Sequence, residues 1–378
     1  MKTNLKDETF HGTADAPWYD TQGKPIQAHG GQVQRFTVDG REKWYWIGED
    51  KTYGYRPCGG IHMYSSDDLL HWKDEGIILR TMQSTDEFED AYFQTLYGTC
   101  SAEEKERIFV DLDQNNCVIE RPKMLYNEKT GKYVIWFHAD GRFPGCRGDY
   151  DKAKAGVAVC DSPTGAFRLL GTYKLNYHDD PNGDYGFDGW ENRGSVRDMN
   201  LFLDTDQTAY IIYSSEGNRT TFISRLDDTY TALAVPKEKA EEGVDFTRNF
   251  IGGFREAHAM FLYRNKYYMI NSGCTAWSPN PAGYAVADHP MGPWKDLGNP
   301  CVDEGKETTY DSQSTCVIPV DAGRGRYIYM GDRWREDDLG NSGYIWLPIL
   351  FSPDGTIMLK KRENWNFTRF PDNATIIR

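Results

Sequence analysis

The chain has 378 residues, enough for one large domain or two ordinary ones, and carries a net charge of −14 at pH 7. No run of Lys and Arg is long enough to follow a phosphate backbone, so nucleic acid and anionic membranes are poor candidates for partners. Aromatic residues form 14% of the chain, and stacking on sugar or base rings is one use for such a surplus.

One aromatic-rich alternating pattern recurs five times along the chain. Its copies are KWYWIGE (43–49), KYVIWFHA (132–139), AYIIYSSE (209–216), KYYMINSG (266–273) and RYIYMGDRW (326–334). Alternation with β-branched and aromatic residues predicts strands. An earlier strand precedes most copies across a hairpin turn such as DG, TG or RNK.

A third strand, richer in small residues, follows several copies and ends in an Asp or Ser turn. Examples are IHMYSSDD, GVAVCDSP, TFISRLDD and GYAVADHP. The chain is therefore predicted to form antiparallel meanders of three to four strands. We expect no amphipathic helix longer than about ten residues.

Five meanders in one chain predict an all-β fold, a five-bladed β-propeller, with a β-sandwich bearing decorated hairpins as the alternative. No change in composition marks a second domain. We expect a single catalytic domain over residues 1–378, with about the first 20 residues and the C-terminal segment closing or flanking it. Loops rich in Gly, Asp and Pro at 140–155, 178–194 and 235–254 are expected to rim one face and shape a pocket.

The eight cysteines are scattered, without a CxxC pair or a Cys/His cluster. This argues against a structural zinc site and favours reduced thiols, with a few disulfides as the alternative. The first residues, MKTNLKDETFHG, lack the apolar segment of a secretory signal, and no run of 18 apolar residues occurs. We expect a cytoplasmic protein, or a secreted or periplasmic one if a signal peptide has been removed.

One polar residue stands just upstream of each meander, at an equivalent point of its blade. The five are His29 in IQAHGGQ, Glu120 in CVIERPKM, Asp198 in SVRDMNLF, Glu256 in REAHAMFL and Gln313 in DSQSTCVI. Because the innermost strand of each propeller blade faces the central channel, we predict that these side chains converge on the axis and form a site.

Each of the five also has an ordinary structural explanation. Glu120 and Asp198 each follow or precede an arginine and can form a local ion pair. His29 fits a hydrogen-bonded structural histidine, Glu256 a solvated strand end, and Gln313 a polar loop. The functional interpretation depends on the set rather than on any one member.

Paired carboxylates on a rigid rim suit hydrolysis of a glycosidic bond. One carboxyl group stays protonated and gives its proton to the leaving oxygen, while a second activates water or attacks. A neighbouring carboxylate or an apolar wall raises the pKa of the acid. Metal-dependent hydrolysis fits less well because no His/Asp group has ligand spacing, and GxSxG and GxxxxGK[ST] motifs are absent.

From about residue 26 to 350 the chain resembles glycoside hydrolase family 43, most closely the branch that holds the exo-β-1,3-galactanases. The resemblance is carried by IQAHGG, VIERPKMLYN, SVRDMNLFLD, IIYSSE, REAHAMF, NSGCTAWSPN, DSQSTCVIP and YMGDRW. It implies a five-bladed propeller, the fold that the repeats predict independently, and hydrolysis with inversion.

The resemblance also implies roles for two carboxyl groups. Glu256 corresponds to the family's general acid, which usually lies in Glu-Gly-Pro or Glu-Ala-Pro, whereas His258 replaces the proline here. Asp198 corresponds to the aspartate that orients the acid and tunes its pKa. The family's usual base, an aspartate on the first blade, is missing from Ala28-His29-Gly30.

The absent base is itself typical of the galactanase branch, in which a glutamine on the fifth blade lies near the attacking water. Gln313 corresponds to it, and either orients water or acts through its imidic tautomer. Glu120 corresponds to an extra glutamate that contacts substrate hydroxyls and assists the base. Many relatives have a histidine that helps hold a channel calcium where Gln313 stands, so we expect neither a metal nor a cofactor.

Other motif residues are expected to contact an oligo- or polysaccharide substrate. They are His29, Gln32, Arg121, Glu216, His258, Trp277, Asp332 and Trp190, with Tyr185 and Arg147 as further sugar contacts. Gln32 departs from the branch, which usually has a third glycine at that position. Each aromatic candidate also has an ordinary role in packing or at the surface.

The sequence therefore predicts an inverting exo-glycosidase that releases terminal galactose from β-1,3-galactan or arabinogalactan-type chains. An α-L-arabinofuranosidase or a β-xylosidase of the same family is the first alternative. A carbohydrate-binding propeller without turnover is the second, and the missing base aspartate favours it.

Overall fold

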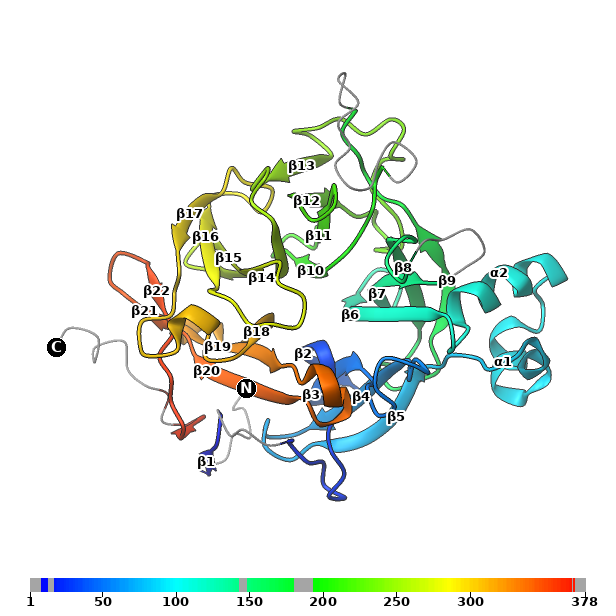
Figure 1. Ribbon diagram of the computed structural model, residues 1–378, viewed down its shortest axis with the longest axis horizontal. Coiled ribbons are helices and arrows are strands. Elements are labelled where there is room, and N and C mark those ends of the chain that lie inside the picture. Colours follow the sequence, from blue (N-terminus) through cyan, green and yellow to red (C-terminus); the bar gives the residue numbers. More distant parts are fainter. Residues whose placement is uncertain (1–7, 13–16, 143–147, 180–192, 369, 371–378) are drawn as a thin grey trace.

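A computed structural model describes residues 8–12, 17–142, 148–179, 193–368 and 370. Five antiparallel sheets are arranged around a central axis, each following the chain in order from its innermost strand outward (Figure 1). This confirms the predicted five-bladed β-propeller and excludes the β-sandwich. Each aromatic-rich segment found in the sequence is the second strand of its blade.

The blades have these strands. Blade 1 contains β2 (His29–Val38), β3 (Arg41–Glu49), β4 (Ile61–Ser66) and β5 (Lys73–Leu79). Blade 2 contains β6 (Cys117–Asn127), β7 (Lys132–Gly141), β8 (Lys154–Cys160) and β9 (Arg168–Tyr173). Blade 3 contains β10 (Met199–Leu203), β11 (Ala209–Ser215), β12 (Thr220–Arg225) and β13 (Phe246–Asn249). Blade 4 contains β14 (Arg255–Tyr263), β15 (Lys266–Gly273), β16 (Gly283–Ala287) and β17 (Lys295–Gly298). Blade 5 contains β18 (Gln313–Asp321), β19 (Arg326–Arg333) and β20 (Gly343–Pro348).

The innermost strands form a closed ring. β2 contacts β6, β6 contacts β10, β10 contacts β14, β14 contacts β18, and β18 returns to β2. Because neighbouring blades share these contacts, the first residues of the five inner strands lie at one end of a common channel. The propeller therefore brings together residues that are far apart in the sequence.

Short strands outside the blades join segments near the two ends of the chain. β1 (Thr9–Phe10) pairs antiparallel with β23 (Trp365–Asn366), and β21 (Leu350–Phe351) pairs with β22 (Ile357–Met358). Short 3-10 helices lie at η1 (Thr85–Glu89), η4 (Lys306–Thr308), η5 (Ala322–Arg324) and η6 (Glu336–Asn341). Part of the predicted loop 235–254 is the outer strand β13.

The connection between blades 1 and 2 is helical, and its longer helix, with 11 residues, lies at the limit of about ten residues expected from the sequence. It contains α1 (Ala91–Tyr97) and α2 (Ala102–Leu112), which lie at the edge of the propeller (Figure 1). A capping box between Ser101 and Glu104 starts α2, and this Ser-x-x-Glu pattern is visible in the sequence. Leu112 anchors the helix in the core next to blades 1 and 2.

Much of the aromatic content lies inside the molecule. Trp46, Trp72, Trp136 and Trp346 are fully buried, and three of them pack with Tyr344 between blades 1 and 5. Their burial removes large apolar areas from water and holds adjacent blades together. Among the described residues, no helix is long and apolar enough to cross a membrane.

Candidate active site

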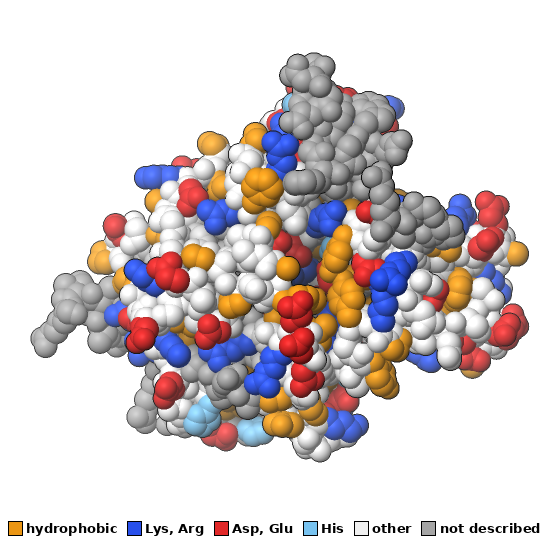
Figure 2. All heavy atoms as spheres, in the orientation of Figure 1, with side chains coloured by type: hydrophobic (Ala, Val, Ile, Leu, Met, Phe, Trp, Pro, Cys, Tyr) orange, Lys and Arg blue, Asp and Glu red, His pale blue; other side chains and the backbone are white. Residues whose placement is uncertain are grey.

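A pocket of about 320 Å³ opens at the end of the channel where the inner strands begin. Acidic and hydrophobic side chains gather near the middle of this face (Figure 2). The pocket is lined by Glu49, Glu120, Arg121, His138, Tyr150, Arg197, Asp198, Asn218, Glu256, Cys274, Ala276, Trp277, Gln313 and Trp334. Four of the five predicted polar residues therefore line one cavity, and His29 does not.

Three inner strands have a β-bulge at the pocket end, immediately after the polar residues His29, Glu120 and Glu256. In each bulge the next residue adopts a left-handed backbone: Gly30 (φ 57°), Arg121 (φ 53°) and Ala257 (φ 57°). A bulge re-aims the neighbouring side chains, and a left-handed non-glycine residue stores strain that typically marks functional sites.

Glu256 is held from two blades. Its Oε1 accepts a hydrogen bond of 2.9 Å from Nε2 of Gln313, and the thiol of Cys274 donates a further one. Burial, and then the negative charge of Asp198, raise the pKa of Glu256 to about 8. Oδ2 of Asp198 accepts the backbone N–H of Ala257 at 3.1 Å, which fixes the chain next to Glu256.

Gln313 uses all four of its hydrogen-bonding positions. Nε2 donates to Glu256 and to Oγ of Ser272 at 3.1 Å, and Oε1 accepts from Nε1 of Trp334 at 3.2 Å and from the guanidinium of Arg121. Arginine and tryptophan are donors only, so their contacts fix which end of the amide is oxygen.

Arg121 connects four groups at the pocket floor. Its guanidinium contacts Oδ2 of Asp198 at 3.0 Å, the carbonyl oxygen of Ser314 at 3.0 Å, and Gln313. Its backbone N–H donates to Oε1 of Glu49 at 2.8 Å. The ion pairs with sequence neighbours that were considered for Glu120 and Asp198 do not form: Asp198 pairs with Arg121 of another blade.

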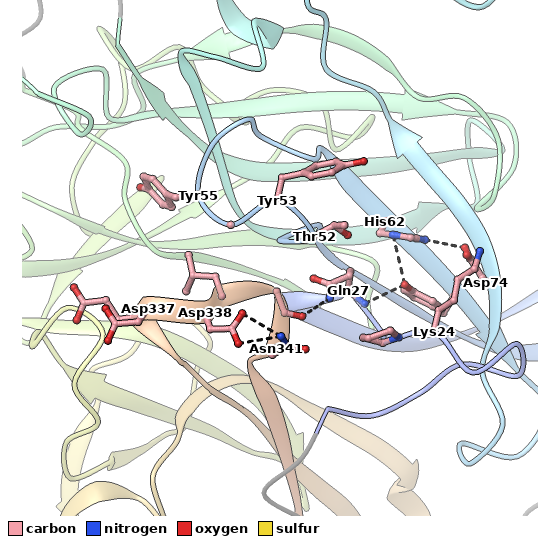
Figure 3. Close-up of a pocket in the computed structure, with 16 residues that line it drawn as sticks. Lys24, Gln27, Thr52, Tyr53, Tyr55, His62, Asp74, Asp337, Asp338 and Asn341 are labelled. Atoms are coloured by element: carbon pink, nitrogen blue, oxygen red, sulfur yellow. Dashed lines mark hydrogen bonds and ion pairs between the residues drawn. The ribbon is translucent and has the colours of Figure 1, made fainter.

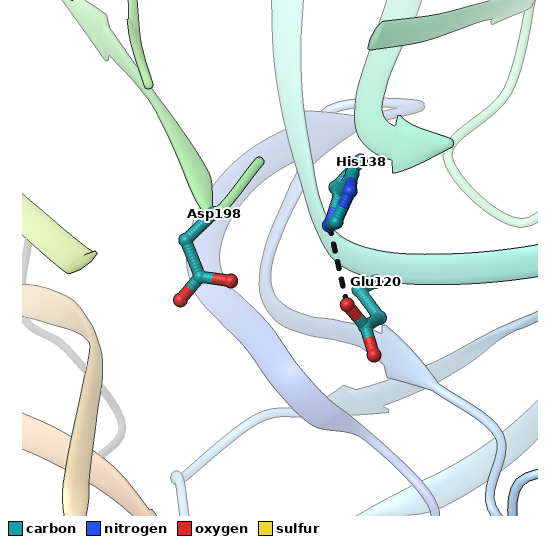
Figure 4. A group of neighbouring side chains, drawn as sticks. All are labelled: Glu120, His138 and Asp198. Atoms are coloured by element: carbon teal, nitrogen blue, oxygen red, sulfur yellow. Dashed lines mark ion pairs between the residues drawn. The ribbon is translucent and has the colours of Figure 1, made fainter. Parts of the chain in front are cut away.

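Glu120 is kept ionised by a histidine across the blade (Figure 4). Nδ1 of His138 lies 3.2 Å from Oε2 of Glu120, and Nε2 lies 3.0 Å from Asp140. Burial opposes ionisation of Glu120, but His138 and Lys51 outweigh it and lower its pKa to about 2. Burial likewise opposes the charge of His138, whereas Asp140 and Glu120 raise its pKa to about 9. Oε1 of Glu120 accepts from Tyr150 at 3.0 Å.

Glu49 is a buried carboxyl group of the pocket that the sequence analysis missed. Its Oε2 lies 2.9 Å from Nζ of Lys51. Burial raises its pKa above the usual range and the charge of Glu120 adds to this, while Lys51 and Arg121 oppose it. Glu49 ends β3 opposite His29, as His138 on β7 pairs with Glu120. Polar residues towards the ends of these second strands were therefore a usable sequence signal for the pocket.

Lys123 lies below the pocket inside the channel and is fully buried. Its Nζ donates to the carbonyl oxygens of Gly30 at 2.6 Å and Arg121 at 3.3 Å, the two bulge residues of blades 1 and 2. Burial and the charge of Arg121 lower the pKa of Lys123 to about 7. It holds the two bulges together from beneath.

Glu120, His138 and Asp198 have ligand atoms within 4.8 Å of one another, the spacing of a metal site. A metal requires a neutral imidazole, whereas His138 is held as a cation between Glu120 and Asp140. This group of described residues therefore fits an ion-pair network better than a metal centre.

Several predicted substrate contacts do not line the pocket. His29 is fully buried, stacks on Tyr344 and lies 3.5 Å from Asp332, whose Oδ2 accepts the N–H of Gly30 at 2.6 Å. Both His29 and Asp332 support the first bulge from behind. Oε1 of Gln32 accepts the N–H of Met124 at 2.8 Å, so this side chain joins two inner strands.

His258 and Glu216 also serve the scaffold. Burial lowers the pKa of His258 to about 3, and its Nε2 lies 3.2 Å from Oγ1 of Thr221. Glu216 pairs with Arg248 at 2.9 Å. His258 lies in the bulge of β14 and contacts blade 3, and Glu216 lies in the turn between β11 and β12. Trp190, Tyr185 and Arg147 lie outside the described residues.

Aromatic residues form the rim. Trp277 packs edge-on against Trp334, with ring centroids 5.2 Å apart, and against Tyr55 at 6.1 Å. The hydroxyl of Tyr55 lies 3.4 Å from Oε1 of Glu120. Trp277 was a predicted sugar contact, whereas Trp334 and Tyr55 were not. Aromatic faces around a polar floor are typical of sugar-binding pockets.

A wider groove of about 820 Å³ lies next to the pocket, between loops of blades 1 and 5 (Figure 3). Tyr55 lines this groove, and its hydroxyl contacts Glu120 of the pocket. The groove is bordered by η6, with its acidic residues, and by Tyr53, which is 69% exposed. Nε2 of His62 lies 2.8 Å from Asp74 at its far end.

Comparison with known proteins finds matches among solved structures. No protein-family model matches the chain, and no curated protein does. Among solved structures, a GH43 β-1,3-galactosidase with galactodeoxynojirimycin is 34% identical, with a TM-score of 0.74 over 93% of this chain and 99% of that one.

Two exo-β-1,3-galactanase structures are also similar. The enzyme from Clostridium thermocellum is 30% identical, with a TM-score of 0.71 over 94% of this chain. The enzyme from Phanerochaete chrysosporium, in a structure with galactose, is 28% identical, with a TM-score of 0.70 over 95% of this chain. The chain spans 66% and 68% of the length of these two proteins.

Proposed function

The chain belongs to glycoside hydrolase family 43, and we propose that it is an inverting, exo-acting enzyme that releases terminal galactose from β-1,3-linked galactan or arabinogalactan-type chains. The observation that carries the proposal is the pairing, in one pocket, of a carboxyl group that stays protonated with one that stays ionised. The β-1,3-galactosidase and exo-galactanase activities named for its relatives support the choice of sugar and linkage.

Glu256 is the proposed general acid. With a pKa of about 8 it carries a proton at neutral pH and gives that proton to the leaving oxygen. Asp198 is the proposed positioning residue: its charge raises the pKa of Glu256, and its contact with the N–H of Ala257 orients the strand that carries the acid. This chemistry usually requires two carboxyl groups with separated pKa values. Here the pKa of Glu256 is raised and the pKa of Glu120 is lowered.

The attacking water must lie on the opposite side of the sugar from the acid. Gln313 is hydrogen-bonded to Glu256 and has no free donor or acceptor position, so it can orient water only after giving up a present partner. Glu120 accepts three contacts, from Tyr55, Tyr150 and His138, and a carboxylate has about four acceptor positions. We therefore assign the role of orienting the attacking water to Glu120.

Gln313 then acts by holding the acid. The imidic tautomer would carry a proton on Oε1, yet the two groups facing Oε1, Arg121 and Trp334, are both donors. This environment favours the ordinary amide. Gln313 keeps Glu256 in place and links it to Arg121, which in turn contacts Asp198.

The shape of the site supports exo action. A volume of about 320 Å³ is at the small end for a ligand pocket. Trp277 and Trp334 line it, and Tyr55 packs against Trp277. Such a pocket suits the terminal residue of a chain rather than its middle, with the aromatic faces available for stacking on the sugar.

The test is a substrate panel: β-1,3-galactobiose and -triose, β-1,4- and β-1,6-galactobiose, and aryl α-L-arabinofuranoside and β-xyloside. We expect galactose from the β-1,3-linked substrates at a rate at least tenfold above every other. Faster release of arabinose or xylose would support the first alternative. Binding of the β-1,3-linked sugars by calorimetry, with no release from any substrate, would support a binding protein.

A further inference from the structure

Two thiols lie in contact behind one wall of the pocket. The thiol of Cys117 donates a hydrogen bond to the sulfur of Cys58, which also accepts from the backbone N–H groups of Gly60 and Ile119. Cys117 is buried, Cys58 is partly buried, and both belong to the core cluster of blades 1 and 2. Seven cysteines lie in the described part of the chain, and all are present as free thiols.

The pair joins two segments that carry pocket residues. Cys58 lies in the loop between β3 and β4, three residues after Tyr55, and Cys117 is the first residue of β6, three residues before Glu120. The N–H of Cys58 donates to the carbonyl oxygen of Gln114 at 2.7 Å. The two thiols therefore lie at the base of the contact between Tyr55 and Glu120.

We propose that Cys58 and Cys117 form an oxidisable pair that closes to a disulfide and fastens the Tyr55 loop to the inner strand of blade 2. The two sulfur atoms are hydrogen-bonded neighbours, and a disulfide requires them to approach to about 2 Å. The backbone on both sides is already positioned by the hydrogen bond between Cys58 and Gln114.

A low-molecular-weight disulfide supplies the oxidant. The thiolate of Cys58 attacks one sulfur of that molecule, which forms a mixed disulfide and releases one small thiolate. Cys117 then loses its proton and attacks the sulfur of Cys58, and the second small thiolate leaves. Two electrons pass to the oxidant, which becomes two small thiols once both thiolates are protonated.

Cys58 is the suited attacking group. It is the more accessible of the two, and the ammonium of Lys51 lies near it. The hydrogen bond from Cys117 lowers the pKa of Cys58 to about 7, against the effect of burial, while the pKa of Cys117 is raised by the same bond. The pair thus divides into an attacking and a resolving thiol.

The disulfide would close the segment from residue 58 to 117, which includes α1 and α2. Cross-linking restricts the unfolded chain, so the oxidised protein is expected to melt roughly 5 °C higher than the reduced protein. Neither sulfur lines the pocket. The inference is therefore independent of the substrate, and its readouts are mass and melting temperature.

The experiment reduces the full chain, removes the reductant, adds oxidised glutathione, alkylates the remaining thiols and maps peptides by mass spectrometry. We expect two of the eight cysteines to be lost together, as one peptide pair joined through Cys58 and Cys117. Cys117→Ser should stop at glutathione on Cys58, and Cys58→Ser should leave Cys117 unmodified. The matched control Cys100→Ser should behave like the unaltered chain.

Three results would overturn the proposal. They are alkylation of both Cys58 and Cys117 after oxidation of the unaltered chain, linkage of either one to a different cysteine, and an oxidised protein with an unchanged melting temperature. The unaltered chain alone gives all three readouts, so a variant that fails to fold does not affect the decision.

Discussion

Nε2 of Gln313 donates a hydrogen bond to Oε1 of Glu256 at 2.9 Å, which joins the inner strands of blades 5 and 4 at the pocket floor. The other positions of the amide are filled by Ser272, Trp334 and Arg121. Through Arg121 the same network reaches Asp198. The proposed acid is therefore part of a connected polar cluster, and each member offers a separate test.

Glu256→Gln removes the proposed proton donor. Hydrolysis of β-1,3-galactobiose should fall by about 10²–10⁴-fold, because the leaving sugar oxygen needs protonation. An aryl galactoside with a good leaving group needs little acid assistance and should keep most of its rate. Steady-state kinetics on both substrates measure the difference. The exposed Glu128→Gln is the control, and an equal loss on both substrates would contradict the role.

Asp198→Asn should move the basic limb of the pH profile. The negative charge of Asp198 raises the pKa of Glu256, so its removal lowers that pKa and the acid loses its proton at lower pH. In kcat/KM against pH, the limb that we expect near pH 8 should shift downward. Asp228→Asn, a surface carboxylate, serves as control. A limb that stays in place or moves upward would exclude this role for Asp198.

Sodium azide should distinguish the two residues considered for the water. A small anion can replace water that a missing residue no longer activates, so Glu120→Gln should regain turnover on an aryl galactoside and form galactosyl azide. Gln313→Ala should not be rescued, because it disturbs the acid, and should lose more on natural linkages than on aryl substrates. Azide rescue of Gln313→Ala with none for Glu120→Gln would restore the role that the sequence predicts for Gln313.

The free energy of unfolding should depend on pH because the pKa of Glu256 is raised in the fold. A carboxyl group with a pKa of about 8 in the fold and an ordinary value when unfolded favours the fold below about pH 4.5, and this contribution is lost as pH rises towards 8. Relative to the unaltered chain, Glu256→Gln should therefore gain up to about 5 kcal/mol between pH 4.5 and 8, since the pKa rises by about 3.5 units and each unit corresponds to about 1.4 kcal/mol. Urea unfolding at both pH values measures this, and a constant difference would contradict it.

The sequence predicts the propeller well because each blade repeats the same aromatic-rich second strand, and burial of this strand on both faces favours apolar residues along most of its length. The same repetition locates Glu120, Asp198, Glu256 and Gln313, since each stands at the start of an inner strand. It does not separate His29 from them. A bulge directs His29 behind the wall, where Asp332 and Tyr344 contact it.

The missed residues come from contacts that periodicity does not encode. Glu49 ends β3 and His138 lies three residues before the end of β7, and only the strand register brings them next to the bulges. Tyr150 and Tyr55 reach Glu120 from loops whose paths depend on tertiary packing. The helical connection was missed because it is short and its capping box, rather than a long apolar stripe, starts α2.

Proton NMR of β-1,3-galactotriose during the first minutes of hydrolysis tests the central claim most directly. The spectrum should show galactose released first as the α-anomer, together with β-1,3-galactobiose, because inversion of a β-linkage gives an α product. Galactose appearing first as the β-anomer would contradict inversion. Absence of galactose at enzyme concentrations that bind the trisaccharide would contradict the hydrolase itself.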